Sequence, residues 1–353
     1  MKGMKIGIDF GSASLKIFVE DKGLVVDEPA IVAIDTVTGN PIAFGKSADM
    51  VYGRCSDSIK VSKVIRHGVI SDFVMAERML RYYLQRVCGN RIYKPNVIIS
   101  LSTDISSLEK KTYLDAVTLA GAGRVCMVEG ILASAIGADV DIDKIGGRMV
   151  LDIGHQLTEF AVISMGSIAA SGVIRRGSDE IDKAIISHLK KDRDINIGPH
   201  TAREIKNKIT SAQLRDCETA LMVSGKSNLD EMPISFEITS TEIYPFIDEQ
   251  ITALVRDIHS EMQTIPPELL ADAADHGILL CGGGAMIFDI AERIESEIGI
   301  RCEIVNEPRL TKIKGLGTLM MNEELLESNG YRFIFKDEIR EKIRRFDRLK
   351  KQS

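Results

Sequence analysis

The sequence lacks the patterns that mark several classes of protein. Its six cysteines include no Cys-x-x-Cys pair, which argues against a disulfide or zinc framework and favours reduced cytosolic thiols. The formal net charge is −6 instead of positive, which argues against general nucleic-acid binding. We assign no metal or catalytic role to the histidines without ligand spacing, which are His67, His188, His200, His259 and His276.

Long apolar runs are also missing. The N-terminal residues are basic, but Asp9 interrupts the apolar run behind them too early for a signal peptide. The least polar window, residues 160–174, is too short and too rich in serine and glycine to span a bilayer, and we interpret it as two buried strands around a glycine turn. We expect no targeting or membrane-spanning segment. With 44% apolar and 27% charged residues, the chain has the composition and length of a soluble protein of two domains.

Two stretches of the chain share one pattern. They are MKIGIDFGSASLKIFV (residues 4–19) and MVLDIGHQLTEFAVIS (residues 149–164). In each, an apolar run ends in Asp-x-Gly, a polar turn follows, and a second apolar run leaves it, which predicts a strand, a turn and a strand. The repetition indicates a duplicated architecture with a cleft between two halves.

This spacing suits phosphate chemistry. A glycine lets the backbone approach a ligand, successive N–H groups form an anion-binding nest, and small hydroxyls add donors. Each aspartate would hold a hydrated divalent cation beside the phosphates. The candidate contacts are Asp9, Gly11, Ser12, Ala13 and Ser14 in the first hairpin, and Asp152, Gly154, His155 and Gln156 in the second. The alternative is that each Asp-x-Gly is only a turn.

A third element, HGILLCGGGAMIF (residues 276–288), joins a buried strand through three glycines to a helix expected to start near Ala285. The glycines clear space and a helix N-terminus favours anions, so Gly282, Gly283, Gly284 and Ala285 are further nucleotide contacts. The alternative is a tight connection between a strand and a helix.

In this order, the three elements resemble those of the actin, hexokinase and heat-shock-chaperone superfamily of ATP-binding proteins. Within it, the chain is most similar to the bacterial actin MreB and its Mbl relatives, from about residue 4 to about residue 321. The other stretches that carry the likeness are VVDEPAIVAID (25–35), VIRHGVISDF (64–73), ASAIGA (133–138), RRGSDEIDKAII (175–186), IGPHTAREIK (197–206) and TIPPELLADAADHGILLCGGGA (264–285).

The resemblance implies an α/β, two-lobed, actin-like (ribonuclease-H-like) fold with a duplicated core and two inserted subdomains. Lobe I would span 1–146, with its core in 1–28 and 74–146 and an insertion at 29–73. Lobe II would span 147–320, with its core in 147–181 and 240–320 and an insertion at 182–239. Residues 321–335 would return to lobe I, and 336–353 form a basic amphipathic tail. ATP and Mg²⁺ would lie between the lobes, with Asp9 and Asp152 holding the metal through water.

Two departures from the family pattern concern hydrolysis. The water-positioning glutamate of the family aligns with Gly130, and two glycines of the second hairpin are replaced by His155 and Gln156. A water-orienting group contributes about 10² to 10⁴ in rate, so we expect slow or absent hydrolysis with nucleotide binding retained. Asp152 and Thr158 stay catalytic candidates, and Gln156 and Glu129 are the alternative water-orienting groups.

Four further residues bear on nucleotide contacts. Lys16 stands where MreB-like chains usually have an apolar residue and actin has a phosphate-binding lysine, and the alternative is a strand lysine facing solvent. Glu204 and Lys206 match a segment that touches the nucleoside in the family. Arg203 stands where a glutamate is usual, which puts ribose recognition in doubt.

Two segments are candidates for membrane contact. Ile92 and Tyr93 lie in a loop that touches the bilayer in MreB relatives, and the alternative is that they tuck under the neighbouring helix. In the tail, eight basic and four acidic residues accompany an apolar helical stripe of Ile339, Ile343, Phe346 and Leu349. Each basic group near an anionic membrane surface contributes about 1 kcal/mol to the free energy of membrane binding. The alternative is a surface helix packed on the protein.

The sequence therefore predicts an ATP-binding, MreB-like protein of the cytoplasm. By resemblance, it would form membrane-associated filaments of its own copies at the inner face of the cell membrane, govern cell shape, and organise peptidoglycan synthesis with the wall-synthesis machinery. The alternative is a non-polymerising actin-fold switch or assembly scaffold. A sugar kinase is disfavoured, because the chain contains no convincing sugar site.

Overall fold

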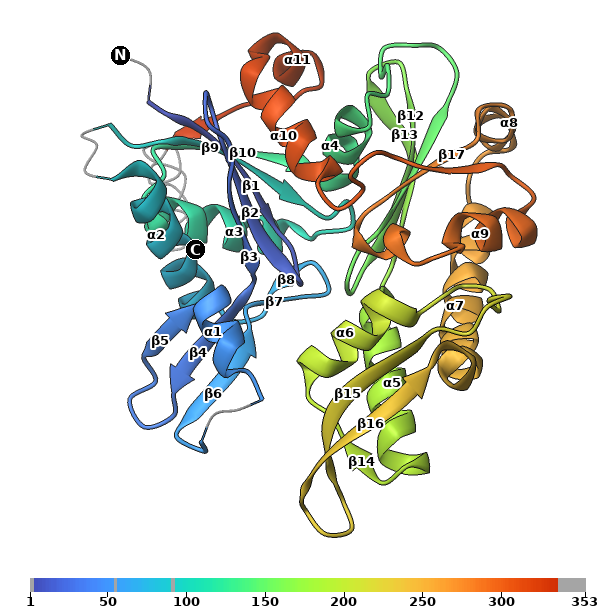
Figure 1. Cartoon of the computed structure of the whole chain (residues 1–353). Coiled ribbons are helices and arrows are strands. Elements are labelled where there is room, and N and C mark those ends of the chain that lie inside the picture. The colour runs from blue at the N-terminus through green and yellow to red at the C-terminus, as the bar shows by residue number, and fades with distance from the viewer. Residues whose placement is uncertain (1–2, 54–55, 90–92, 336–353) are drawn as a thin grey trace, which may run out of the picture. The chain divides into compact units, whose positions relative to one another are not determined.

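The computed structural model describes residues 3–53, 56–89 and 93–335. The chain forms two compact units, which are described separately below (Figure 1). Of the described residues, 3–51, 56–89, 93–139 and 312–335 belong to unit 1, and 52–53 and 140–311 belong to unit 2. Among the described residues, no helix is both long and apolar enough to cross a bilayer.

Unit 1 is built on a mixed sheet and a smaller antiparallel sheet. Its strands are β1 (Lys5–Phe10), β2 (Ser14–Val19), β3 (Gly23–Pro29), β4 (Ile31–Asp35), β5 (Pro41–Phe44), β6 (Ile59–Lys63), β7 (Ile65–Arg66), β8 (Val69–Ile70), β9 (Asn96–Leu101), β10 (Arg124–Glu129) and β19 (Ile334–Phe335). Its helices are α1 (Lys46–Val51), α2 (Phe73–Cys88), α3 (Ser107–Ala120), α4 (Gly130–Gly137), α10 (Thr311–Met321, whose first residue is counted with unit 2) and α11 (Glu323–Ser328).

Local sequence signals explain where the helices beside this sheet begin. The Asp72 carboxylate accepts a hydrogen bond from the Met75 backbone N–H at the start of α2. At the start of α3, Ser106 and Glu109 form a capping box, in which each side chain accepts from the other residue's backbone N–H. Six residues of α2 from 75 to 84 are buried, and α2 packs on α3. The apolar side of α2 is therefore part of the core.

Unit 2 also has one larger and one smaller sheet. Its strands are β11 (Arg148–Ile153), β12 (Thr158–Ser164), β13 (Ser167–Ile174), β14 (Ile195–Asn196), β15 (Ala220–Ser227), β16 (Pro233–Thr239), β17 (Ile278–Cys281) and β18 (Cys302–Ile304). Its helices are α5 (Asp179–Asp192), α6 (Pro199–Ile209), α7 (Ser240–Met262), α8 (Pro267–His276), the 3₁₀ helix η1 (Gly283–Met286) and α9 (Ile290–Ile298).

The two larger sheets repeat one strand plan. In unit 1 the order is β19-β10-β9-β1-β2-β3, and in unit 2 it is β13-β12-β11-β17-β18. In both, three antiparallel strands follow one another. The first of them pairs in parallel with a fourth strand, which pairs in parallel with a fifth. The expected duplication is confirmed in the strand plan, and β1 and β11 hold equivalent places.

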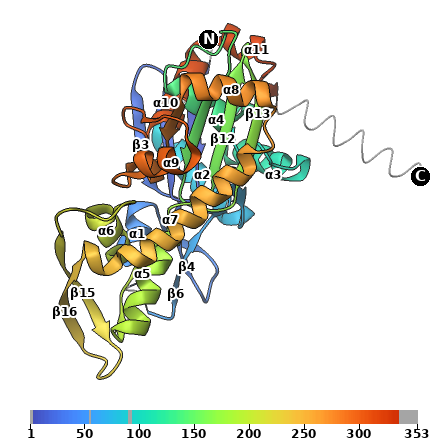
Figure 2. The same ribbon diagram turned by 90° about the vertical axis from the view of Figure 1, so that its right-hand side faces the viewer.

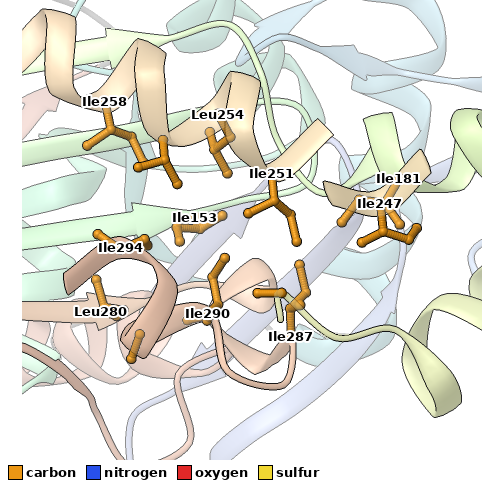
Figure 3. Packing of buried hydrophobic residues seen from close by; sticks show 14 of the residues in the cluster. Ile153, Ile181, Ile247, Ile251, Leu254, Ile258, Leu280, Ile287, Ile290 and Ile294 are labelled. Carbon is orange, nitrogen blue, oxygen red and sulfur yellow. The ribbon is translucent and has the colours of Figure 1, made fainter. Parts of the chain in front are cut away.

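Helix α7 supplies much of the unit 2 core. Figure 2 shows α7 along its length, and it packs on α5 and β13. Its buried residues recur at helical spacing. In Figure 3, Ile251, Leu254 and Ile258 face Ile153, Leu280 and Ile294, and Ile247 lies beside Ile181. Each is at most 5% exposed. Complete burial of such a side chain contributes about 1.5–3 kcal/mol, so this layer fixes the strands that carry the second Asp-x-Gly turn.

The unit boundaries differ from those expected. The chain divides at Asp139/Val140 and Thr311/Lys312, instead of at residues 146 and 320. Almost all of α10 therefore belongs to unit 1. The physical reason is close packing, because a Cβ on Gly315 would lie only 1.8 Å from the Ala133 carbonyl oxygen of α4.

Two elements also differ from the sequence expectation. Gly282 precedes the 3₁₀ helix η1, which begins at Gly283. The next α-helix, α9, begins only at Ile290. No α-helix therefore starts near Ala285, since Gly282 has a left-handed φ of 86° and the backbone turns sharply there. Strand β13 is an edge strand with alternating exposure, whereas the expectation was that both strands of residues 160–174 are buried.

Candidate nucleotide-binding site

The first Asp-x-Gly hairpin forms a closed turn at the end of β1. The Gly11 backbone N–H donates to the Ser14 carbonyl at 3.0 Å, and Asp9 stands opposite Lys16 in the strand register. Ser12 is buried, Ala13 is exposed and Ser14 is half-buried. The turn thus offers backbone and hydroxyl donors at one end of the sheet, as the sequence predicts for a phosphate-binding turn.

Lys16 is turned toward this hairpin and is not a solvent-facing strand residue. Its Nζ lies 3.1 Å from Asp9 Oδ2 and 2.9 Å from Ser14 Oγ. Both residues of the ion pair are less than 10% exposed. Of the two interpretations of Lys16, the solvent-facing one is wrong, and the lysine lies among the candidate phosphate contacts.

Asp9 is ionised in this environment. Burial acts to raise the pKa of its carboxyl group, but the ammonium groups of Lys16 and Lys312 and the hydrogen bonds from Lys16 and Ser100 hold the pKa below its usual value. The Ser100 hydroxyl donates to Oδ1 at 3.4 Å. Both carboxylate oxygens of Asp9 therefore already accept hydrogen bonds.

Gly130, at the position of the family glutamate, lies beside Lys312. A Cβ on Gly130 would lie 3.2 Å from the Leu101 carbonyl oxygen and 3.2 Å from Lys312 Nζ. The space that a side chain would enter at this position therefore contains an ammonium group. Glu129, the neighbouring candidate, is engaged elsewhere, because it accepts a hydrogen bond from Tyr331 Oη and lies 3.9 Å from Lys110 Nζ.

In unit 2, the second hairpin and the glycine element come together. Asp152 pairs with Cys281 across β11 and β17 and is 7% exposed. A Cβ on Gly282 would lie 2.3 Å from Asp152 Oδ1, and a Cβ on Gly284 would lie 2.3 Å from the Ile153 side chain. Glycine is therefore required at both positions for the chain to pass beside this carboxylate.

The turn of the second hairpin tolerates its two unusual residues. Neither His155 nor Gln156 has a positive φ, so the loss of two glycines costs no strain there. The backbone N–H groups of Ser178 and Asp179 donate to the carbonyls of Gly154 and His155 at 3.0 and 2.9 Å. Gln156 Nε2 donates to Asp179 Oδ2 at 3.0 Å. The turn is thus held by the start of α5.

Three other predicted site residues have structural partners. Thr158 is fully buried, and its hydroxyl donates to the Arg176 carbonyl at 3.0 Å. Lys206 Nζ lies 2.8 Å from Asp182 Oδ2 and donates to the Ser178 carbonyl at 3.2 Å. Glu204 is exposed and pairs with Lys208. Lys206 is therefore joined to the turn of the second hairpin, whereas Glu204 is paired with an exposed lysine on its own helix.

Two aspartates of α5, Asp179 and Asp182, have partners around the second hairpin. Burial raises the pKa of Asp182, although the nearby Lys206 ammonium acts to lower it. Asp179 contacts both Gln156 and Lys183. In the sequence, these two aspartates are marked by their place in the run of acids in the first turn of α5.

The residues around Asp9 do not fit a directly bound Mg²⁺ ion. Both oxygens of Asp9 are engaged, and two ammonium groups lie nearby. Within 3–53, 56–89 and 93–335, no group of three or more His, Cys, Asp or Glu side chains is arranged to hold a metal ion. Coordination through water by Asp9 and Asp152 stays a prediction.

The membrane candidates are only partly described. Tyr93 is 52% exposed, so it is not tucked under the neighbouring helix. The other candidates lie outside the described residues, and they are Ile92, Ile339, Ile343, Phe346 and Leu349.

Lys312, Ser100 and Tyr331 are the partners that sequence reasoning missed. Ser100 and Asp9 are 91 positions apart, and Tyr331 and Glu129 are 202 positions apart. Lys312 lies in a segment that also contains Gly315 and Gly317, and no spacing in the sequence marks it as a partner of Asp9.

Comparisons with known proteins find relatives that match most of the chain. A family model described as "MreB/Mbl protein" matches residues 3–328. The chain is 32% identical over 328 residues to the "Cell shape-determining protein Mbl" of Bacillus cereus, which covers 93% of this chain and 98% of the relative. These matches extend over both units.

Solved structures show the same fold. MreB5 of Spiroplasma citri bound to ADP is 25% identical, with a TM-score of 0.87 over 92% of this chain and 98% of MreB5. The same protein bound to AMPPNP is 26% identical, with a TM-score of 0.87 over 94% and 99%. The "MamK double helical filament" is 13% identical, with a TM-score of 0.76 over 91% and 99%, and shares the fold alone. The expected actin-like fold is confirmed, and the chain belongs to the MreB/Mbl family.

Proposed function

We propose that this chain is an ATP-binding, actin-like cytoskeletal protein that assembles with its own copies into filaments. The observation that carries the proposal is the repeated site, in which equivalent strands β1 and β11 of two matching sheets each end in a buried aspartate followed by a turn. The nucleotide-bound structures of Spiroplasma MreB5 support ATP as the ligand class.

ATP is proposed to bind as its Mg²⁺ complex, the metal neutralising phosphate charge. In unit 1, the Gly11–Ser14 turn and Lys16 would contact phosphates. In unit 2, Gly154, Gln156 and the Gly282–Ala285 segment would contact the nucleotide, and Asp152 would face the metal through water. Lys206 is proposed to contact the nucleoside, because its ammonium already lies at the base of the second turn.

Hydrolysis is proposed to be slow. Gly130 supplies no carboxylate, and the other candidate groups are engaged, since Glu129 accepts from Tyr331 and Thr158 donates to Arg176. Gln156 is held by Asp179. A missing water-orienting group lowers a rate by about 10² to 10⁴, so filaments of this chain would keep their nucleotide far longer than filaments of a rapid ATPase.

The cellular role is proposed from family membership. The Bacillus cereus relative is named as a cell shape-determining protein. We place the filaments of this chain at the inner face of the cell membrane, where they would govern cell shape and organise peptidoglycan synthesis with the wall-synthesis machinery. Exposed Tyr93 and the tail candidates would provide the membrane contact.

High-speed pelleting of the purified protein with Mg-ATP, Mg-ADP or no nucleotide, followed by electron microscopy, tests this proposal. Ordered filaments favoured by ATP are the expected result. A chain that binds ATP yet stays in the supernatant under all three conditions would instead support a non-polymerising nucleotide switch or scaffold.

A further inference from the structure

Unit 1 has a surface pocket that the proposed function does not use. Its volume is about 960 Å³, and it lies where β2 meets α10 and the start of α11. These two helices follow each other along the chain and lie together in Figure 1. The volume is at the upper end of the range for ligand sites, which is about 300–1,000 Å³. The pocket is therefore large enough to take several side chains of a bound segment.

Part of the pocket wall is apolar. The half-buried ring of Phe18 lies against Gly317, where an added Cβ would be 3.0 Å from the ring. Met321 lines the same pocket and is 53% exposed. Covering such exposed apolar surface with another apolar group is favourable, because the surface is removed from water. The wall therefore favours an occupant with apolar side chains.

The side of the pocket formed by α11 is acidic. Glu323 and Glu324 line it, and Lys314 on α10 is the basic residue among the lining residues. Glu323 pairs with Lys5, with 3.0 Å between nitrogen and oxygen. Glu324 is exposed, and α11 contains three glutamates and no basic residue. This side of the pocket therefore favours a cationic partner.

The C-terminal tail has the chemistry that this pocket favours. Residues 336–353 lie outside the described residues, and their sequence contains eight basic and four acidic residues. The apolar stripe at helical intervals among them consists of Ile339, Ile343, Phe346 and Leu349. Such a stripe is stabilised when a surface covers it. The pocket offers an apolar wall and acidic neighbours on the same chain.

The tail is also long enough to reach the pocket. Phe335, the last described residue, pairs with Arg124 at the edge of the six-stranded sheet, and β2 is four strands away from β19 in that sheet. At about 4.8 Å between neighbouring strands, the distance across the sheet is about 19 Å. Residues 336–353 would span about 27 Å as a helix and up to about 60 Å when extended.

We propose that residues 336–353 dock into this pocket of their own chain, with apolar side chains against Phe18 and Met321 and basic side chains beside Glu324. Docking covers the apolar stripe, so the pocket controls when the tail is available to a membrane. The docked state requires neither nucleotide nor filament assembly. Only its consequence for membrane contact rests on the proposed function.

Limited trypsin digestion of the full chain, followed by mass spectrometry, tests the proposal without nucleotide or membrane. Trypsin cuts after the basic residues of the tail, and the cleavage rate follows the population of the undocked state. Met321→Ser should raise the rate of tail cleavage about tenfold, because an apolar contact is lost. Glu324→Gln should raise it by up to about fivefold, the range of an exposed ion pair.

Each variant has a matched control in unit 1. Met50→Ser changes another exposed methionine, on α1, and Glu327→Gln changes an acid of α11 that does not line the pocket. Both should leave the rate of tail cleavage unchanged. Phe346→Ser in the tail should raise the rate as much as Met321→Ser. The two changes together should add little, because they remove one shared interaction.

Three results would overturn the proposal. Equal rates for Met321→Ser, Phe346→Ser and the unaltered protein would show that the tail does not occupy the pocket. Protection that grows with protein concentration would assign the pocket to the tail of a second copy. Protection that appears only with vesicles containing phosphatidylglycerol would make the membrane the partner of the tail. Because ATP binding is measured separately on the same samples, failure of the docking is distinguishable from failure of the proposed function.

Discussion

Asp9 and Lys16 form a buried ion pair whose members depend on each other. The oxygen and nitrogen are 3.1 Å apart, and the side chains are only 12% and 7% exposed. Such a pair adds little net stability over an apolar pair, but the loss of one member leaves a buried charge alone. Stability alone therefore does not account for the buried pair.

Lys16→Met should lower the free energy of unfolding by about 3 kcal/mol, because Asp9 would lose its nearest cation. It should also weaken ATP binding. Chemical denaturation and nucleotide titration measure the two effects, and Lys16→Arg, which keeps the charge, is the control. Unchanged affinity in a folded Lys16→Met protein would remove Lys16 from the site.

Gly130 and Lys312 should be coupled in hydrolysis. Gly130→Glu alone should raise turnover little, because the new carboxylate would pair with Lys312. Combined with Lys312→Met, it should raise turnover by about 10² or more, the range of a restored water-orienting group. Phosphate release under single-turnover conditions measures this. Equal rates for the single and double variants would contradict the coupling.

The packing of α10 on α4 positions Lys312, and it depends on one glycine. Gly315→Ala would place a methyl group 1.8 Å from the Ala133 carbonyl oxygen. Alanine is the better helix former by about 1 kcal/mol, but overpacking costs about 1–3 kcal/mol and the contact here is very short. We expect a net loss of stability in thermal melts. Thr318→Ala, at an exposed site of the same helix, is the control and should leave the melting temperature unchanged.

Tyr331 joins the return segment (residues 321–335) to β10, a strand of the sheet that carries the first Asp-x-Gly hairpin. Burial and the hydrogen bond to Glu129 both raise the pKa of Tyr331 above its usual value near 10. A raised pKa in the folded state gives stability that is complete below pH 10 and is lost as the pH rises above it.

Tyr331→Phe should therefore destabilise the protein by about 1–2 kcal/mol at neutral pH, since Glu129 loses its donor. The difference from the unaltered protein should shrink above pH 10. Urea unfolding at pH 8 and above pH 10 provides the comparison. A difference that is constant across this range would show that the tyrosine packs without a stabilising hydrogen bond.

Short-range patterns in the sequence predict many elements well. The strand Asn96–Leu101, both Asp-x-Gly hairpins and the long helix of residues 240–262 follow from apolar periodicity and turn residues. The 3₁₀ helix after Gly282 does not, because it depends on the approach of the backbone to Asp152, which is distant in the sequence. The membership of α10 in unit 1 likewise depends on the contact of Gly315 with Ala133.

The residues of the candidate site likewise fall into two groups, those that sequence spacing indicates and those that only the fold brings together. Asp9, Gly11, Asp152 and Gly282 carry recognisable spacing, so the sequence indicates them. Lys312 has no such spacing, because helix packing brings it to Gly130, which lies about half the chain away in the sequence, and to the neighbourhood of Asp9. Likewise, only the structure shows that Glu129 is held by Tyr331, which leaves fewer groups to orient water.

For the molecule as a whole, the duplicated strand plan is the central observation. Two sheets of the same order each present a buried aspartate at the end of the equivalent strand. Positions 130, 155 and 156 depart from the pattern expected of the MreB/Mbl family, to which the chain belongs. The proposed function therefore combines nucleotide binding with slow hydrolysis.

The most direct measurement is the stoichiometry and affinity of Mg-ATP binding to the full chain by titration calorimetry. The account predicts one ATP per chain, with binding weakened at least about tenfold by Asp152→Asn or Gly282→Val, because each change disturbs the second turn. No heat of binding at millimolar ATP with a folded protein would contradict the account.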